Sequence, residues 1–350
     1  MKKILVDARC IFDSGIGIYL QEILMQLGKS ECQLSLIVRK EQEAKVRQLD
    51  IRISEFIPVE FGQFSLKNLF SFYQIIKRNQ YYFAPSLSIM PLSLSCTKIV
   101  TIHDLCPFVY KRFFGFRLAW SYWLLALQQV ITANKVIAIS NFTRNELIRV
   151  YGSWLFKKIT VIPNGLSRRF ELTSDEGSSR VTSKPFILCV GNVKPHKNII
   201  NFINFFTKHE DLKTKYKLVI VGQNEGFKTG VEQELINDEY CEFTGYVSDE
   251  ELYLLYKNAS FFVFPSLYEG FGLPLLEAMS FDIDILASDI PVFKEIAGDS
   301  IEYFDPITFD GLYSAIMKIE QMPSENRYKD VLEYYSWSNA QTIFIRDVLK

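Results

Sequence analysis

The chain has 350 residues and a formal net charge of −1, and 48% of its residues are hydrophobic. This length is comfortable for two domains, and the apolar content supplies a sizeable core. Six cysteines without a CxxC pair and three widely separated histidines argue against a disulfide framework, a zinc site or another metal cluster, and they favour reduced thiols in a cytosol.

The first half of the chain alternates short apolar strands with helical segments. A buried strand over residues 3–7 precedes a loop that contains Gly15 and Gly17, and a helix over residues 18–29 follows with apolar residues at helical spacing. The uncharged run 118–134 predicts a buried helix, because it is at the short limit for crossing a bilayer. Further strands are expected at residues 33–38, 53–58, 98–102 and 135–139.

A second series of strands and helices begins after Pro163-Asn164-Gly165. The polar stretch 173–184 is typical of a loop or linker, and the last segment, 327–350, is rich in helix formers and aromatic residues. The repeated alternation predicts two doubly wound α/β units in tandem, each with a parallel sheet, and a ligand at the carboxyl ends of the strands where the units meet. Strands are expected at residues 186–190, 217–221, 241–243, 260–264 and 283–287.

Charge is distributed unevenly along the chain. Residues 1–170 carry 23 Lys and Arg against 11 Asp and Glu, whereas residues 171–350 carry 16 against 29. The basic half predicts an anionic partner. Basic residues are interleaved with Phe, Tyr and Trp over residues 64–83 and 108–123, which suits an anionic membrane surface, although core helices with a basic wet face would give the same pattern. Nucleic acid is disfavoured, because no recognised binding motif is present.

Residues 261–280 form the most informative stretch. An apolar strand leads into a loop with Glu269, Gly270 and Gly272, and a helix is expected to begin near Pro274 with Glu277 in its first turn. Such a loop directs backbone N–H groups and the positive end of a helix dipole at an anion such as a phosphate. Two carboxylates beside a diphosphate make sense if the ligand also offers hydroxyl groups, as a nucleotide sugar does.

This stretch resembles the Glu-x7-Glu motif of retaining glycosyltransferases of family 4, with Glu269 and Glu277 at the right spacing. The resemblance covers essentially the whole chain and implies the GT-B fold: an acceptor-side Rossmann-like domain over residues 1–166, a nucleotide-sugar domain over 167–326, and a last helix, 327–350, that packs back onto the first domain. It implies that Glu269 lies near the donor sugar and its phosphates and that Glu277 binds the ribose. Gly270, Phe271, Gly272 and Leu273 are then donor-binding.

Other segments match the family in the expected order. Gly15 and Gly17 resemble its glycine loop near the donor phosphates, and the third glycine of a dinucleotide fingerprint is missing. His103, in Thr-Ile-His-Asp-Leu, resembles a histidine that approaches the donor sugar. Ser140 resembles a helix N-cap.

The loop over residues 191–198 resembles the basic loop that holds the donor diphosphate. That role falls to Lys197, which with Glu269 and His103 makes up the expected catalytic set. Many family members place an arginine shortly after the glycine at position 191, where this chain has Asn192. Lys194 is therefore expected to supply the second charge, as a point charge rather than a fork.

These features predict a metal-independent hexosyltransferase without a cofactor. It would move a sugar from a nucleotide-sugar donor to a lipid-linked or polysaccharide acceptor, as bacterial mannosyl- or rhamnosyltransferases of surface polysaccharides such as O-antigen, lipopolysaccharide or capsule do. Two alternatives stay open: a nucleotide-sugar epimerase of the same architecture, and an inactive partner protein that binds sugar nucleotides. The basic half and the lack of a signal-peptide pattern predict a cytoplasmic location, peripheral to the inner face of the membrane.

Overall fold

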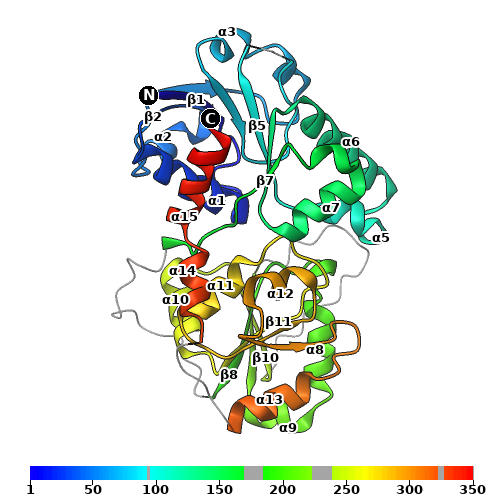
Figure 1. The fold of residues 1–350 in the computed structure, drawn as a ribbon. Helices are drawn as coiled ribbons and strands as arrows, with labels where there is room; N and C mark the ends of the chain where they lie inside the picture. The colour runs from blue at the N-terminus through cyan, green and yellow to red at the C-terminus, as the bar shows by residue number, and fades with distance from the viewer. Residues whose placement is uncertain (93–94, 169–183, 223–238, 322–326, 350) are drawn as a thin grey trace. The chain divides into compact units, whose positions relative to one another are not determined.

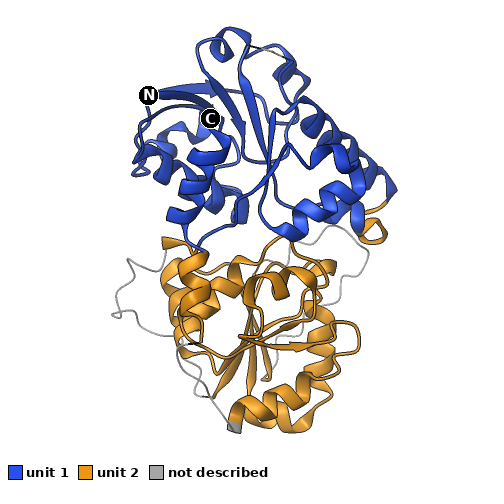
Figure 2. Cartoon of the chain, viewed as in Figure 1, with its two compact units in different colours: residues 1–109, 116–165, 335–350 blue, residues 110–115, 166–334 orange. Residues whose placement is uncertain are grey.

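The structure, a computed structural model, describes residues 1–92, 95–168, 184–222, 239–321 and 327–349 (Figure 1). The chain divides into two compact units (Figure 2). Unit 1 comprises residues 1–109, 116–165 and 335–350, and unit 2 comprises residues 110–115 and 166–334. The predicted linker at 173–184 lies almost entirely outside the described residues. No helix among the described residues is both long enough and apolar enough to cross a bilayer.

Unit 1 is built on a parallel sheet whose described strands run in the order β3-β2-β1-β4-β5-β6-β7. Strand β1 shows how both faces are covered: Ile4 and Val6 pack into one core, and Leu5 packs into another. Sheets buried on both faces read as continuous apolar runs, as these strands do. The strands are β1 (Lys2–Asp7), β2 (Cys32–Arg39), β3 (Glu55–Val59), β4 (Tyr81–Ala84), β5 (Thr97–Ile102), β6 (Lys135–Ala138) and β7 (Ile159–Val161).

The helices of unit 1 flank this sheet. Helix α7 begins after Ser140, whose hydroxyl accepts a hydrogen bond from the N–H of Thr143 at 2.9 Å, which confirms the predicted N-cap. The helices are α1 (Ser14–Gly28), η1 (Lys40–Gln42), α2 (Glu43–Val46), η2 (Leu66–Leu69), α3 (Tyr73–Ile76), α4 (Cys106–Val109), α6 (Phe116–Thr132), α7 (Asn141–Tyr151), η3 (Ser153–Leu155), α15 (Trp337–Ile343) and the π-helix η6 (Phe344–Val348).

Unit 2 repeats the plan with a parallel sheet whose described strands run in the order β10-β9-β8-β11-β12-β13. Its strands are β8 (Phe186–Val190), β9 (Lys217–Val221), β10 (Cys241–Gly245), β11 (Phe261–Phe264), β12 (Ile285–Ser288) and β13 (Glu302–Phe304). Its helices are α5 (Lys111–Phe114), η5 (Pro195–Lys197), α8 (Ile199–Thr207), α9 (Glu210–Lys215), α10 (Asp249–Asn258), α11 (Leu273–Ser280), α12 (Pro291–Ala297), α13 (Leu312–Gln321) and α14 (Lys329–Tyr334).

The C-terminal segment differs from the single helix expected over residues 327–350. It divides into α14, α15 and η6, because Ser336 caps a new helix by accepting a hydrogen bond from the N–H of Asn339 at 3.3 Å. Residues up to 334 belong to unit 2, where the Tyr328 hydroxyl donates to the carbonyl of Ile283 at 3.1 Å. Residues 335–350 belong to unit 1, where Trp337 and Phe344 join the core that contains α1.

Three strands were not expected from the sequence: β4, β7 and β13. Strand β4 corrects the membrane interpretation of the stretch 64–83 for its last residues, because Tyr81, Tyr82 and Phe83 are buried in the sheet. The apolar run 118–134 is also only partly a buried helix, since α6 exposes several large side chains to solvent.

Candidate functional site

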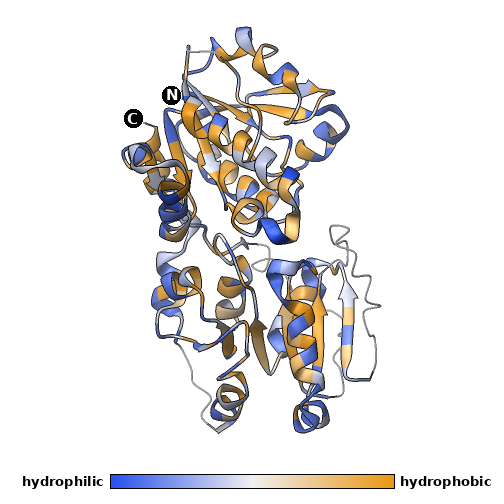
Figure 3. Cartoon of the chain, turned by 90° about the vertical axis from the view of Figure 1, so that its right-hand side faces the viewer, coloured by the Kyte–Doolittle hydropathy of each residue, from blue (hydrophilic) through white to orange (hydrophobic). Residues whose placement is uncertain are grey.

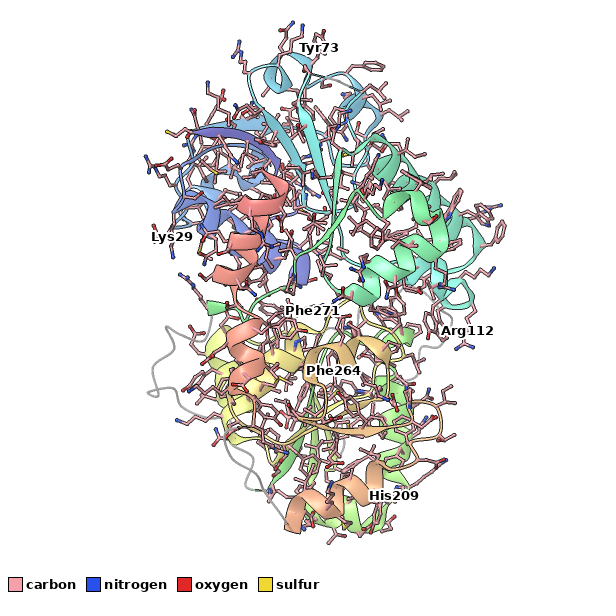
Figure 4. All side chains as sticks on the ribbon, viewed as in Figure 1. Lys29, Tyr73, Arg112, His209, Phe264 and Phe271 are labelled. Carbon is pink, nitrogen blue, oxygen red and sulfur yellow. The ribbon has the colours of Figure 1, made fainter. Side chains whose placement is uncertain are left out.

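The turn between β11 and α11 is shaped by Gly272. This glycine has φ +126°, which side chains rarely adopt, and a Cβ there would lie 3.0 Å from the ring of Phe293. Gly272 occupies the N-cap position of α11, and Pro274 follows within the first turn. Gly270 and Phe271 are buried in the turn, and Leu273 is half-buried. Figure 4 labels Phe264, where β11 ends, and Phe271 in the turn.

An ion pair joins this turn to the loop that follows β8. The Nζ of Lys197 lies 2.6 Å from Oε1 of Glu269, and the buried hydroxyl of Ser266 donates to the same oxygen at 2.7 Å. The two charged side chains are only 20% and 12% exposed. The backbone holds the same two loops together, because the N–H of Leu267 donates to the carbonyl of His196 at 2.7 Å. Since β8 and β11 are neighbours in the sheet, their carboxyl ends bring the expected Lys197 and Glu269 into contact.

The two oxygens of the Glu269 carboxylate differ in their surroundings. Oε1 accepts both hydrogen bonds, from Lys197 and from Ser266, and Oε2 has no partner among the residues that the structure describes. A carboxylate oxygen held by a cation and a hydroxyl is fixed in position. The remaining oxygen can accept a hydrogen bond from a ligand hydroxyl.

The basic loop itself depends on two glycines. Gly191 has φ +155° and lies beside the stem of Lys197, and Gly222, after β9, has φ +153°. A Cβ on Gly222 would lie 2.2 Å from the carbonyl oxygen of Gly191, so this backbone contact requires glycine. Asn192 and Lys194 are half-buried in the same loop.

His196 is part of this loop and is half-buried. Burial lowers the pKa of its imidazole to about 4, because the charged form loses hydration. Its backbone carbonyl, rather than its ring, makes the contact with the turn before α11.

Glu277 lies in the second turn of α11, not in the first as expected, because the helix begins at Leu273. Its side chain is 2% exposed, and its Oε2 accepts a hydrogen bond at 3.0 Å from the hydroxyl of Tyr256, on α10. Tyr256 is fully buried and stacks on Phe281 with ring centres 5.4 Å apart. The carboxylate is therefore held from the neighbouring helix.

The glycine segment of unit 1 is helical, which differs from the loop expected from the sequence. Gly15 and Gly17 were expected in a loop, but α1 already begins at Ser14, and the N–H of Gly17 donates to the carbonyl of Asp13 at 2.7 Å. A Cβ on Gly17 would lie 2.7 Å from the carbonyl oxygen of Ile11, so the first turn of α1 packs against the chain that precedes it. A Cβ on Gly15 would meet nothing within 4 Å.

His103 follows β5 and is held by three elements of unit 1. Its Nε2 lies 2.8 Å from the carbonyl oxygen of Pro85, its own carbonyl accepts from the Thr143 hydroxyl at 3.2 Å, and the Tyr19 ring packs edge-on at 4.9 Å. A carbonyl only accepts, so Nε2 carries the proton and Nδ1 is an acceptor. Burial lowers the pKa of this ring to about 4.

In unit 2 the structure thus brings together Lys197 and Glu269, with Asn192 and Lys194 on the loop of Lys197. In unit 1 His103 contacts Tyr19 of α1, whereas Gly17 packs against Ile11. Sequence reasoning missed Ser266, Tyr256 and Tyr19. Ser266 could have been suspected from its place three residues before Glu269, whereas Tyr256 lies on the preceding helix and carries no sequence signal. No group of three His, Cys, Asp or Glu side chains suited to a metal ion occurs among the described residues.

Two family profiles match the chain almost end to end. Residues 14–169 match "Glycosyltransferase Family 4", and residues 172–333 match "Glycosyl transferases group 1". The chain belongs to the family 4 glycosyltransferases. Its sequence is 30% identical over 69% of its length to the O-antigen chain mannosyltransferase RfbU of Salmonella typhimurium, and 27% identical over 60% to the O-antigen chain mannosyltransferase B of Escherichia coli. The matched regions span 66% and 59% of those two relatives, which is less than two thirds of each.

Solved structures show that the chain has the predicted GT-B fold. A sucrose-phosphate synthase from Thermosynechococcus elongatus matches with a TM-score of 0.70 at 17% identity, over 98% of this chain and 97% of that one. The Anabaena protein HepE, in complex with UDP and glucose, matches with a TM-score of 0.68 at 16% identity, over 99% and 95%. At these identities the likeness establishes the fold alone.

The lowered pKa of His103 gives a prediction for the stability of the chain. The ring should stay neutral between about pH 5.5 and about 8, whereas a free histidine titrates near about 6.5. Because the folded state binds this proton more weakly than the unfolded state, stability is full above about pH 6.5 and declines as the pH falls toward about 4. The check is the pH dependence of the His103 ring resonances by NMR, assigned with a His103→Gln variant. A midpoint near that of free histidine would contradict the buried, hydrogen-bonded ring.

Proposed function

We propose that this protein transfers a hexose-type sugar from a nucleotide-sugar donor to a lipid-linked or polysaccharide acceptor in cell-surface glycan synthesis. The proposal is carried by the Lys197–Glu269 pair, which stands on two neighbouring loops at the carboxyl edge of the unit 2 sheet. The relatives named as O-antigen mannosyltransferases support mannose as the first donor sugar to test.

The reaction must stabilise an oxocarbenium-like sugar and a departing diphosphate. We assign the diphosphate charge to Lys197, with Lys194 and the N–H groups of the turn before α11, because fixed donors aimed at developing charge are usually the largest catalytic contribution. On this assignment the diphosphate needs no metal ion. Oε2 of Glu269 accepts from a hydroxyl of the donor sugar. The role of His103 near the donor sugar, which the sequence implies, stays a prediction.

Retention of the anomeric configuration is the second part of the proposal. A double displacement would need Glu269 as the nucleophile, but Lys197 and Ser266 hold its Oε1, and we assign its Oε2 to a hydroxyl of the donor sugar. We therefore favour attack on the same face as the leaving group, with the leaving phosphate accepting the proton of the acceptor hydroxyl. A stable glycosyl adduct on Glu269, detected by mass spectrometry, would overturn this preference.

The test of the function is a transfer assay with a panel of guanosine and uridine diphosphate sugars, in the presence of a chelator, with the product anomer assigned by NMR. Transfer to an added glycan acceptor with the donor's anomeric configuration supports the proposal. Interconversion of the donor sugar without an acceptor would identify an epimerase instead. Nucleotide binding without turnover of any donor would identify an inactive binding protein.

A lipid-linked acceptor would bring the protein to a membrane surface. We propose that it works in the cytoplasm and associates peripherally with the inner face of the membrane through its basic N-terminal half. The excess of 23 Lys and Arg over 11 Asp and Glu in residues 1–170 supports attraction to anionic lipid.

The hydroxyl of Tyr256 is predicted to position Glu277 for the ribose. Tyr256→Phe keeps the ring that packs on Phe281 but removes the hydrogen bond to the buried carboxylate. A hydrogen bond to a charged group contributes about 1.5–3 kcal/mol, so the KM for the donor should rise about tenfold or more while kcat changes little.

The rise in KM should be smaller for a donor whose nucleoside contains 2′,3′-dideoxyribose, because that ribose has no hydroxyl for Glu277 to bind. Steady-state kinetics with both donors measures this difference, and thermal unfolding of the variant serves as the control for folding. An equal rise in KM for both donors would show that Tyr256 does not act through the ribose hydroxyls.

A further inference from the structure

Helix α6 of unit 1 carries an apolar stripe that no part of the described chain covers. Phe116, Trp120, Leu124 and Ile131 are 68%, 41%, 56% and 55% exposed. Their spacing of four, four and seven residues places them on one face of an α-helix. Ala119, Ala126 and Val130 of the same helix are buried, so α6 is anchored on one side and apolar on the other. The side of unit 1 that carries α6 is turned toward the viewer in Figure 3.

The stripe continues onto the segment that follows α7. Trp154 and Phe156 are 48% and 62% exposed. Lys158 ties this segment to the end of α6, because its Nζ donates to the carbonyls of Ile131 at 3.3 Å and Ala133 at 2.9 Å and lies 5.2 Å from the Trp154 ring. We call the six exposed residues together the α6 surface: Phe116, Trp120, Leu124, Ile131, Trp154 and Phe156.

The charge along the segment that carries the α6 surface is almost entirely positive. Residues 116–165, all in unit 1, contain six Lys and Arg and one acidic residue, Glu146. That glutamate is paired with Arg149 at 2.7 Å. Arg117 and Lys157, next to the two ends of the stripe, are exposed. A surface with this charge attracts an anionic partner, and its electrostatic part falls with salt.

We propose that the α6 surface lies in the headgroup layer of an anionic bilayer. The inference deepens the proposed function and rests on it, because only a lipid-linked acceptor requires the bilayer. Large apolar side chains exposed in a row mark an interaction site rather than an ordinary wet surface. Tryptophan suits the boundary between acyl chains and water, because its ring is apolar and its N–H is polar. Apolar residues with flanking Lys and Arg are the composition of helices that lie in this layer.

A second group of exposed apolar residues, Phe64, Leu66, Phe70 and Tyr73, fits a bilayer less well. It lies on short segments without a long helix. Residues 55–92 carry three Lys and Arg and two Glu, so the surrounding charge is nearly balanced. Leu66, 72% exposed, therefore provides a comparison variant in the same unit.

The experiment is co-sedimentation of the full chain with vesicles of phosphatidylcholine alone and with added phosphatidylglycerol. Ile131→Glu should weaken binding to the anionic vesicles about tenfold or more, because it places a carboxylate in the stripe. Ile307→Glu is the matched control, since Ile307 is 80% exposed in unit 2 and undergoes the same change. Leu66→Glu should bind like the wild type. Trp fluorescence of the wild type should shift to the blue only with anionic vesicles.

Several results would overturn the proposal. Ile131→Glu could bind anionic vesicles as well as the wild type does, or Ile307→Glu could lose as much vesicle binding as Ile131→Glu. Vesicle binding could also be lost only in Leu66→Glu, or the wild type could bind neutral and anionic vesicles equally. Light scattering adds one more: a wild-type dimer that Ile131→Glu dissociates would show that a second copy covers the surface. Donor turnover with a water-soluble acceptor should be the same in Ile131→Glu and wild type. If neither protein turned over any donor, the proposed function would be refuted, whereas the vesicle experiment would still test binding to the bilayer.

Discussion

Replacing Lys197 by alanine is expected to lower kcat by a factor of about 100 to 1000. Its ammonium group lies 2.6 Å from Glu269 in a pair that is only 20% and 12% exposed. In such surroundings a charge interacts more strongly than in water, so the loss of a cation that meets the leaving diphosphate costs far more than the loss of a surface lysine. The variant also leaves Ser266 as the remaining partner of Glu269 among the described residues.

The design separates the catalytic effect from a general change in charge. Lys208→Ala removes an exposed lysine of unit 2 and should leave kcat unchanged. Lys194→Ala tests the second charge on the same loop and should give an intermediate loss. Rates are measured at saturating donor, with thermal unfolding as the control for folding. A fall in kcat of less than about threefold for Lys197→Ala would remove this lysine from the reaction.

Glu269→Gln removes the charge of the other partner in the ion pair with Lys197. We expect it to lose most of the turnover while the residual product keeps the anomeric configuration of the donor. The double variant should cost much less than the product of the two single losses, since each substitution already breaks the same pair. Full additivity would show that Lys197 and Glu269 act separately.

The fold could be predicted from the sequence because its strands are apolar runs between helical segments. Strands β8 and β9 have the bounds that the pattern predicts. The unexpected strands are short or mixed in composition: β7 and β13 have three residues each, and β4 places Tyr81 and Tyr82 in a sheet interior. Tyrosine is as compatible with a surface as with a core, so periodicity could not assign these residues.

The residues of the site were predictable where they lie in segments that resemble the family, as Lys197 and Glu269 do, but the contacts between these segments were not. Glu269, Gly272 and Glu277 lie within one strand–turn–helix segment, and their spacing identified them. Their partners come from tertiary structure: Lys197 is 72 residues from Glu269, and Tyr256 is on another helix from Glu277. The start of α1 was placed too late, because glycines suggest a loop unless the close approach of Gly17 to Ile11 is known.

The second large effect is expected at two glycines where backbone approaches backbone. A Cβ on Gly222 would lie 2.2 Å from the Gly191 oxygen in unit 2, and a Cβ on Gly165 would lie 2.3 Å from the backbone nitrogen of Trp337 in unit 1. Backbone cannot move aside as a flexible side chain can. Alanine at either position should therefore lower the free energy of unfolding of its own unit by about 2–4 kcal/mol. Gly62→Ala, where a Cβ would meet nothing within 4 Å, is the control.

The positions of the tryptophans allow the two units to be followed separately. All four, Trp120, Trp123, Trp154 and Trp337, belong to unit 1, so Trp fluorescence reports on that unit, whereas far-UV circular dichroism reports on both. In urea, Gly165→Ala should shift the fluorescence transition. Gly222→Ala should shift only part of the circular dichroism transition and should also weaken donor binding, because the Gly191 loop carries Lys197. If Gly222→Ala instead shifted both signals together, the units would unfold as one, and the loss of stability could not be assigned to the loop beneath Lys197.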